Sequence, residues 1–477
     1  MKLLRMVAVA LALATVASGC VWRVVASVDI AGNEATASVL LRGFSEDGRY
    51  VLLLTAAQLD PLNDTNADND LYRRDLLTGQ TRLVSVVDGT NTAPLDSGVR
   101  SAAISADGRH VAFESDGSHV AGVPGAANMT EVYRRDMNAT TVDHVGTPGV
   151  IANAVDIDDS GDFVSYWESS EMHVENVATG TRVSSGVSGF GVMAGDASAV
   201  YFESVLALVP ADTNTAVDVY RWDVQAGTFS LVTVNEFGTV GALESRREDI
   251  SGDGRRVLFR TASANMVLGD TNGVDDLFVK DIVTGSISRV TVDDTGAEFP
   301  DAPISLGGGS SIDGDGASAV FRMPATSGPS TLYRHRVASG ATLDITPDVF
   351  VQGASEPDLS GDGNYLAYVE GGQVYVQFLE SPVVDSVTPA TVPVGATTSV
   401  TIEGSGYLND ANVYLTGRPG VSVSNVVMVD FSTIAADVTV EPTANPGDLW
   451  VNVETIGTGP GAATGAFGNC GTCLSVS

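Results

Sequence analysis

A short turn followed by an apolar strand recurs along the chain and limits what it can fold into. In one copy, Ser105-Ala106-Asp107-Gly108-Arg109 precedes the apolar segment 110–114, and Tyr133-Arg134-Arg135-Asp136 follows after a loop. An Asp-Gly pair between apolar strands predicts a hairpin, because Gly accepts the positive φ that such a turn needs. The copies of the turn are Ser45–Arg49, Ser105–Arg109, Asp159–Asp162, Gly195–Ala197, Ser251–Arg255, Asp313–Gly316 and Ser360–Gly363.

Each turn is the start of a longer repeat. An apolar strand follows the turn, a second strand carries an aromatic residue or His near its start, and several copies continue through a Thr-Gly or Ser-Gly turn into a last strand. Four short strands in each repeat are typical of a β-propeller blade. The last copy lacks its final strand, but residues 23–29 resemble the final strands at 82–88 and 288–293. We therefore expect an all-β fold, a seven-bladed β-propeller closed by the N-terminal strand, which leaves no open sheet edge.

These residues also carry a family resemblance. Ser-x-Asp-Gly-Arg, an apolar strand and then a Tyr-Arg-x-Asp strand resemble the TolB-type, WD-like propeller repeat. The resemblance covers residues 20–381 and implies the fold, but it implies little about function.

A different pattern begins at Pro382. The opening Ser386-Val387-Thr388-Pro389, the segment 402–407 (Ile-Glu-Gly-Ser-Gly-Tyr) and the late Pro446-Gly447 are similar to an IPT/TIG Ig-like domain, over residues 382–477. Alternation of Val and Ile with polar residues independently predicts the strands of a β-sandwich. The resemblance implies a spacer or a binding module.

The N-terminus reads as an export signal. Lys2 and Arg5 precede an apolar run that is too short for a resident membrane helix, so we expect residues 1–19 to be a signal peptide. Ala17-Ser18-Gly19-Cys20 resembles a bacterial lipoprotein signal, which implies lipidation of Cys20, although Ala17 stands where Leu is usual. Ordinary cleavage and secretion is the alternative.

The chain contains three cysteines. If Cys20 is acylated, Cys470 and Cys473 remain to pair as a local disulfide in the last strand after export. A redox dithiol or a zinc site would need a helical setting or further ligands, which the surrounding sequence does not offer.

Charge narrows the range of partners. The formal net charge is −34, and such a surface repels nucleic acid and anionic membrane. The sequence has no Gly-x-Ser-x-Gly and no His-Glu-x-x-His, so the common nucleophile and metalloprotease motifs are missing. The five histidines are scattered, and we interpret them as structural.

One loop pattern indicates a cation site. Asp-Thr-Asn-x-x-x-Asp-apolar-aromatic occurs three times, and oxygen ligands at its first, third and seventh positions suit Ca²⁺. The alternative is that Asp and Asn cap turns through their own side chains. Gly125, Ala127 and Glu131 replace the ligands in the second repeat, which should lack a site. The candidate ligands are Asp64, Asn66, Asp70, Asp212, Asn214, Asp218, Asp270, Asn272 and Asp276.

Together these patterns favour a cell-envelope lipoprotein that is not an enzyme. We expect a monomeric scaffold whose propeller loops bind an envelope protein or a glycan, with Ca²⁺ as the one candidate cofactor and a lipid on Cys20 as the membrane contact. The alternative is an extracytoplasmic hydrolase or lyase with its site in the propeller channel. Acidic, His and Arg side chains that converge at one channel mouth would favour that enzyme.

Overall fold

The computed structural model describes residues 23–90, 98–117, 119–120, 130–299, 309–323, 331–346, 355–379, 382–407, 411–455 and 466–477. Every regular element in these ranges is a β-strand, so the fold is all-β, as expected. Within them, no helix is long and apolar enough to cross a membrane. The expected signal peptide and Cys20 lie outside the described residues.

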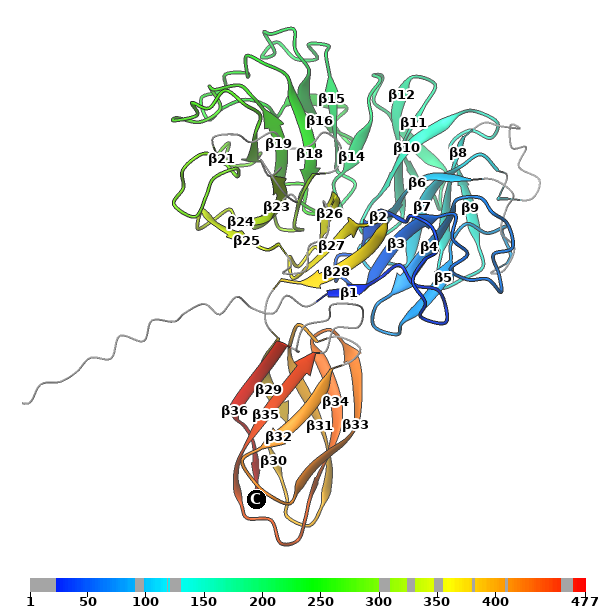
Figure 1. Ribbon diagram of the computed structural model, residues 1–477. Helices are drawn as coiled ribbons and strands as arrows, with labels where there is room; N and C mark the ends of the chain where they lie inside the picture. The colour runs from blue at the N-terminus through cyan, green and yellow to red at the C-terminus, as the bar shows by residue number, and fades with distance from the viewer. Residues whose placement is uncertain are drawn as a thin grey trace, which may run out of the picture.

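Strands β1 to β28 form four-stranded antiparallel sheets, an arrangement consistent with a β-propeller (Figure 1). In each sheet the strand order follows the chain, apart from β1, which joins the last sheet. The first four sheets comprise β2 (Leu40–Phe44), β3 (Tyr50–Thr55), β4 (Asp70–Asp75) and β5 (Gln80–Leu83); β6 (Val99–Ile104), β7 (His110–Ser115), β8 (Glu131–Asp136) and β9 (Val142–Val145); β10 (Ala152–Ile157), β11 (Phe163–Glu168), β12 (Glu171–Asn176) and β13 (Thr181–Ser184); and β14 (Gly191–Met193), β15 (Ala199–Ser204), β16 (Asp218–Asp223) and β17 (Thr228–Leu231).

Three further sheets follow along the chain, and the last of them contains β1. They comprise β18 (Ser245–Ile250), β19 (Arg256–Thr261), β20 (Asp276–Asp281) and β21 (Ile287–Arg289); β22 (Ser310–Ile312), β23 (Ser318–Met323), β24 (Thr331–Arg336) and β25 (Ala341–Asp344); and β26 (Ser355–Leu359), β27 (Tyr365–Glu370), β28 (Gln373–Phe378) and β1 (Arg23–Val25).

The N-terminal strand completes the last sheet. β1 pairs antiparallel with β28, with Arg23 opposite Gln377 and Val25 opposite Tyr375. The guanidinium of Arg23 forms a buried ion pair with Glu370 and lies 4.2 Å from the centre of the Tyr375 ring. The two ends of the propeller sequence are therefore joined by backbone pairing and by a buried charge pair.

The turns between the first and second strands of each sheet are bonded to one another. The amide of Glu46 donates to the carbonyl of Ala106 (3.1 Å), Ala106 donates to Asp159 (3.2 Å), and the series continues from turn to turn. It closes where Asp362 donates to Glu46 (3.2 Å). In the remaining bonds of the series the backbone amide of the first residue donates to the carbonyl of the second: Asp159 to Gly195, Gly195 to Gly252, Asp253 to Gly314, and Gly314 to Gly361.

The residues of the turn motif stabilise the turn itself. Ser105 Oγ donates to Asp107 Oδ1 (2.8 Å), and the amide of Arg109 donates to the same oxygen (2.9 Å). The Arg109 side chain then reaches β8, where its Nε and Nη2 donate to the two oxygens of Asp136 (3.0 and 2.6 Å). The same Arg–Asp pairing recurs in Arg49–Asp75 and Arg255–Asp281.

The turn glycine allows neighbouring sheets to approach. Gly108 has φ of +69°, and a Cβ there would lie 2.1 Å from Cδ2 of Tyr50 in the preceding sheet. Arg73 of that sheet stacks on the Tyr50 ring and donates to the Gly108 carbonyl. Tyr50, Arg73 and Gly108 therefore form one contact between consecutive sheets.

Residues after Val383 form two facing four-stranded sheets. Buried Val400, Ile402, Val438, Leu449 and Val451 contribute to the core between them. One sheet has the order β29-β31-β34-β33 and the other β30-β36-β35-β32, with β30 and β36 parallel. Their bounds are β29 Val383–Thr388, β30 Thr391–Val392, β31 Thr397–Ser405, β32 Asn412–Thr416, β33 Val421–Asp430, β34 Thr433–Val440, β35 Gly447–Thr455 and β36 Ala466–Val476.

An aromatic contact joins this C-terminal pair of sheets to the last propeller-type sheet. Phe431, at the turn between β33 and β34, lies 5.1 Å from the Tyr365 ring, and Tyr365 lies 5.1 Å from Phe378. Figure 1 shows the C-terminal sheets as a separate body next to β1 and β28. The contact places that body at the edge of the face that carries the Asp-Gly turns, because Tyr365 directly follows the last turn.

Candidate functional site in the central channel

The first strands of six of the propeller-type sheets line a common channel. A pocket of about 380 Å³ is lined by residues of β2, β6, β10, β14, β18 and β26, which belong to six different sheets. A second pocket of about 400 Å³ is lined by residues of β2, β6 and β26. Residues from six sheets can line one pocket only where the sheets surround a common central axis.

Bulges shape the channel wall. The pairing register shifts in β2, β6, β10, β18 and β26 where each meets the second strand of its own sheet. A bulge bends its strand and redirects side chains, and bulges are frequent beside functional sites. Arg42 is the extra residue of the β2 bulge, and Glu356 lies in the β26 bulge with φ of +54°.

Some channel carboxylates hold neighbouring sheets together. Oδ2 of Asp156 accepts the amide of Met193 in the next sheet (2.7 Å), and Oδ2 of Asp249 accepts the amide of Ile312 (2.9 Å). Ser311 Oγ accepts the amide of Leu359 in the same way (3.2 Å). These side chains therefore have structural roles between sheets.

Asp358 stands at the equivalent place in β26 but makes weaker contacts. Ser311 Oγ lies 3.4 Å from its Oδ1. Burial between the channel walls, together with the nearby charge of Asp249, raises the pKa of Asp358 to about 7. The protonated and ionised forms of this carboxyl group are therefore both populated near neutral pH. A carboxyl group that titrates in this pH range is suited to proton transfer.

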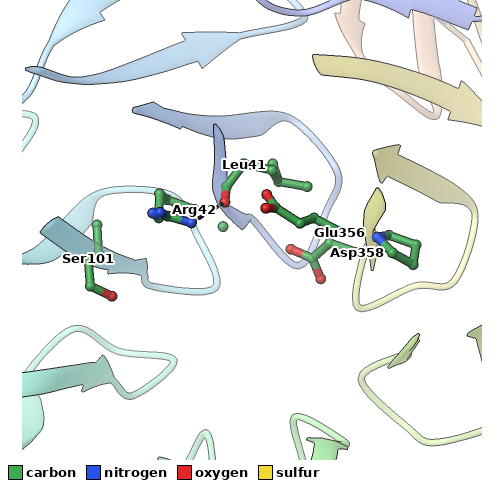
Figure 2. Close-up of a pocket in the computed structure, with 8 residues that line it drawn as sticks. Leu41, Arg42, Ser101, Glu356 and Asp358 are labelled. Atoms are coloured by element: carbon green, nitrogen blue, oxygen red, sulfur yellow. Dashed lines mark hydrogen bonds between the residues drawn. The ribbon is translucent and has the colours of Figure 1, made fainter. Parts of the chain in front are cut away.

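Arg42 and Glu356 share this pocket with Asp358. Figure 2 shows Arg42 beside Ser101 on one side, and Glu356 and Asp358 on the other. Arg42 Nη1 donates to the Leu41 carbonyl (3.2 Å), whereas Arg42 Nε and Glu356 Oε2 are buried without a hydrogen-bond partner among the described residues. One donor and one acceptor in the wall of this pocket therefore lack a partner among the described residues.

The Asp-Thr-Asn loops lie away from the channel, before the third strand of their sheets. In the first loop the amide of Asn66 donates to Asp64 Oδ1 (3.2 Å) and that of Asp68 donates to Asn66 Oδ1 (2.9 Å). The second loop repeats both bonds at Asp212 and Asn214. These are the turn-capping contacts of the alternative interpretation.

A buried carboxylate follows each of these two loops. Asp70 accepts a hydrogen bond from Ser85 Oγ (2.6 Å), and Asp218 accepts one from Thr233 Oγ1 (2.7 Å). Burial raises the pKa of Asp70 to about 7. The hydroxyl groups of Tyr72 and Tyr220 donate to Asp64 and Asp212, which explains the aromatic position of the motif.

The third loop is satisfied differently. Phe278 replaces the tyrosine and has no hydroxyl group to offer Asp270. Arg289, directly opposite Phe278 on β21, lies 3.7 Å from Asp270, 3.5 Å from Asp276 and 2.7 Å from Glu298. These three carboxylates have the spacing of a cation site, and the guanidinium lies among them. Glu298 and Arg289 were not identified from the sequence motif.

The second repeat has a glutamate where the three loops have their last aspartate. Glu131, at the last position of the pattern, accepts from Tyr133 OH (2.9 Å) and from the Gly149 amide (2.8 Å). Gly125 and Ala127 lie outside the described residues. Glu131 is therefore already bonded within its own sheet.

The remaining predicted residues are far from the channel pocket. Cys470 and Cys473 are joined by a disulfide within β36. The histidines are dispersed over several sheets, and His119 is fully buried, with Nδ1 3.0 Å from the Val86 carbonyl oxygen. Burial lowers the pKa of His119 to about 4, so it is neutral at physiological pH.

No protein-family model matches the chain, and no curated protein matches it. Similar solved structures include the β-propeller domain of the Trilobed protease from Pyrococcus furiosus, with 11% identity and a TM-score of 0.47 over 72% of this chain and 95% of that one. TolB from Acinetobacter baumannii has 13% identity and a TM-score of 0.35 over 70% and 80%. Oligogalacturonate lyase in complex with manganese has 12% identity and a TM-score of 0.46, over 72% of this chain and 90% of that one.

Proposed function

We propose that this protein is an exported bacterial cell-envelope lipoprotein that acts as a non-enzymatic binding scaffold. In this proposal residues 1–19 are a signal peptide and Cys20 carries the lipid. Residues 20–381 form one TolB-like seven-bladed propeller closed by β1, and residues 382–477 form an Ig-like domain of the IPT/TIG type.

The proposal rests on the bonds that the residues of the repeat make within the fold. Ser105, Asp107, Arg109 and Asp136 are bonded to one another. Their counterparts in the first and fifth sheets repeat these bonds. Residues that maintain the repeat are therefore committed to the fold. Recognition falls to the loops that differ from sheet to sheet, as is usual where a rigid scaffold presents loops.

Tethering follows from the position of β1. Only Val21 and Trp22 separate Cys20 from Arg23, the first residue of β1. A lipid on Cys20 would therefore hold the last sheet against the membrane, with Trp22 at the interface, where an amphipathic ring is favoured. The acidic surface would keep the other sheets away from an anionic leaflet and available to an envelope protein or a glycan. We propose that the protein acts as a monomer.

We also propose that Ca²⁺ binds at the first two Asp-Thr-Asn loops. Oδ2 of Asp70 and of Asp218 are buried and lack a conventional hydrogen bond, although Asn66 and Asn214 lie close enough to lower the pKa of these carboxyl groups. A hard cation with oxygen ligands would satisfy these atoms. At the third loop the Arg289 guanidinium already supplies positive charge, so that loop is the weakest candidate of the three.

Fractionation tests the scaffold proposal. Wild type should be found with membranes, and Cys20→Ala with a cleavable signal should be soluble and folded. Affinity capture from envelope extracts with the soluble variant, followed by loop substitutions, should identify a protein or glycan that depends on the loops. A membrane-free wild type would overturn the tether.

A hydrolase or lyase remains the second candidate because Arg42, Glu356 and Asp358 converge in the channel. Asp358 would act as the general acid and Glu356 as the general base, with Arg42 stabilising negative charge. Turnover of an envelope glycan that Glu356→Gln abolishes would favour this candidate. Histidine, the third type expected of a catalytic channel, does not line either described channel pocket.

A further inference from the structure

We propose that the channel pocket between β2, β6 and β26 binds a small hydroxylated carboxylate, a molecule with one carboxylate and several hydroxyl groups. This site is separate from the loops of the scaffold proposal. It shares residues with the enzymatic candidate, but binding requires no turnover.

Arg42 supplies the site for the carboxylate. It is the extra residue of a bulge, and no described carboxylate lies within ion-pair distance of its guanidinium. In this respect Arg42 differs from arginines such as Arg23 and Arg260, whose guanidinium groups are paired with carboxylates. A planar guanidinium with free donors matches the geometry of a carboxylate.

Glu356 and Asp358 supply acceptors for hydroxyl groups. Glu356 Oε2 is buried and unpartnered, so it carries a desolvation cost that a ligand hydroxyl would offset. Asp358 has only the 3.4 Å contact to Ser311 among its described hydrogen bonds. Both lie across the pocket from Arg42 (Figure 2).

The mixed charge of the pocket excludes simpler ligands. A bare inorganic anion would bind Arg42 but leave Glu356 facing a like charge. A bare cation would face Arg42. A molecule with a carboxylate at one end and hydroxyl groups at the other satisfies both walls, and Gly43 and Ala102 leave about 400 Å³ for it, within the usual size of small-molecule sites.

The backbone provides a matched variant. Ala154, in the equivalent bulge of β10, has φ of +56°, close to the +54° of Glu356. Alanine is thus compatible with this conformation, and Glu356→Ala should fold. Arg247→Gln serves as the charge control, because Arg247 lines the adjoining pocket and not this one.

Calorimetric titration of the mature chain with gluconate, glucose and acetate tests the site. Gluconate should bind more tightly than either glucose or acetate, which each lack one of the two kinds of group. Arg42→Gln and Glu356→Ala should each weaken gluconate binding about tenfold, the loss expected for a hydrogen bond to a charged group, whereas Arg247→Gln should keep it.

Three results would overturn the proposal: no gluconate binding at about 10 mM, far above useful affinities; equal binding of acetate or glucose; or unchanged binding in both pocket variants. If Glu356→Ala does not fold by circular dichroism, Glu356→Gln takes its place. Mass spectrometry of the titrated mixture distinguishes the ligand site from the hydrolase or lyase candidate. Gluconate that binds but is recovered unaltered supports the ligand site without supporting the enzyme.

Discussion

The amide of Asp362 donates a hydrogen bond to the carbonyl of Glu46 (3.2 Å), which joins the last Asp-Gly turn of the propeller-type sheets to the first. The pairing of β1 with β28 makes a second junction between the same ends of the chain. Closure of the disc therefore rests on two separate contacts. Both junctions hold residues that are distant in sequence, so their loss should affect the cooperative stability of the whole disc.

Arg23→Ala tests the second junction. The variant leaves Glu370 buried without its cation, because the side chains of this pair are only 10% and 5% exposed. Loss of one partner of a buried pair costs about 3 kcal/mol, and urea unfolding should show that decrease. Arg100→Ala is the control: its pair with Asp116 is exposed, so the change should be about 0.5 kcal/mol or less. Equal effects of the two variants would contradict a stabilising role for the buried Arg23–Glu370 pair at this junction.

Gly108→Ala tests the contact between consecutive sheets. The added Cβ would collide with Tyr50 and would also place alanine at φ of +69°. The left-handed conformation alone costs about 1 to 2 kcal/mol, and the collision should add to this. Gly180→Ala has a similar φ of +65° with open space around it, so it measures the conformational cost alone. If both variants lose the same free energy of unfolding, Tyr50 does not pack against the turn as described.

Arg289→Gln tests the third Asp-Thr-Asn loop. Removal of the guanidinium leaves Asp270, Asp276 and Glu298 close together without a counter-charge, so the melting temperature should fall. Ca²⁺ should restore part of this loss, because a cation that binds only the folded state stabilises it. Calorimetry should detect stronger Ca²⁺ binding to the variant at this loop than to wild type. A variant that Ca²⁺ does not stabilise would contradict the view that Arg289 takes the place of a metal ion.

Stability should also depend on pH through Asp358. Its pKa is about 7 in the folded protein, against 3.8 for an ordinary aspartate, so between these values the folded state binds more protons than the unfolded chain. The free energy of unfolding therefore contains a contribution that decreases as the pH rises through this window. Asp358→Asn removes it, and the variant should gain stability relative to wild type between pH 5 and pH 8 in urea titrations. The same difference between variant and wild type at both pH values would contradict the burial of an ionised Asp358.

The propeller-type sheets could be predicted because their signals are local. Asp107, Gly108 and Arg109 interact within one turn or with Asp136 of the same sheet, so the spacing of the motif reflects the contacts it makes. The disulfide partners are likewise close in sequence. Such short-range patterns survive in a single sequence without any knowledge of the tertiary structure.

The channel pocket could not be predicted in this way. Arg42, Glu356 and Asp358 come from the first and the last sheet and share no spacing or motif. Arg289 was also missed, because its role depends on the loss of one hydroxyl group at Phe278, where the other two loops have Tyr72 and Tyr220. Only the register between strands places the arginine opposite that position.

Mass spectrometry of the N-terminal peptide from membrane-bound wild type tests the central claim of a lipid-tethered scaffold most directly. The mature chain should begin at Cys20 with a diacylglyceryl group on its sulfur, and only two residues should separate Cys20 from β1. An unmodified Cys20, or a chain cleaved elsewhere and recovered in soluble form, would contradict it.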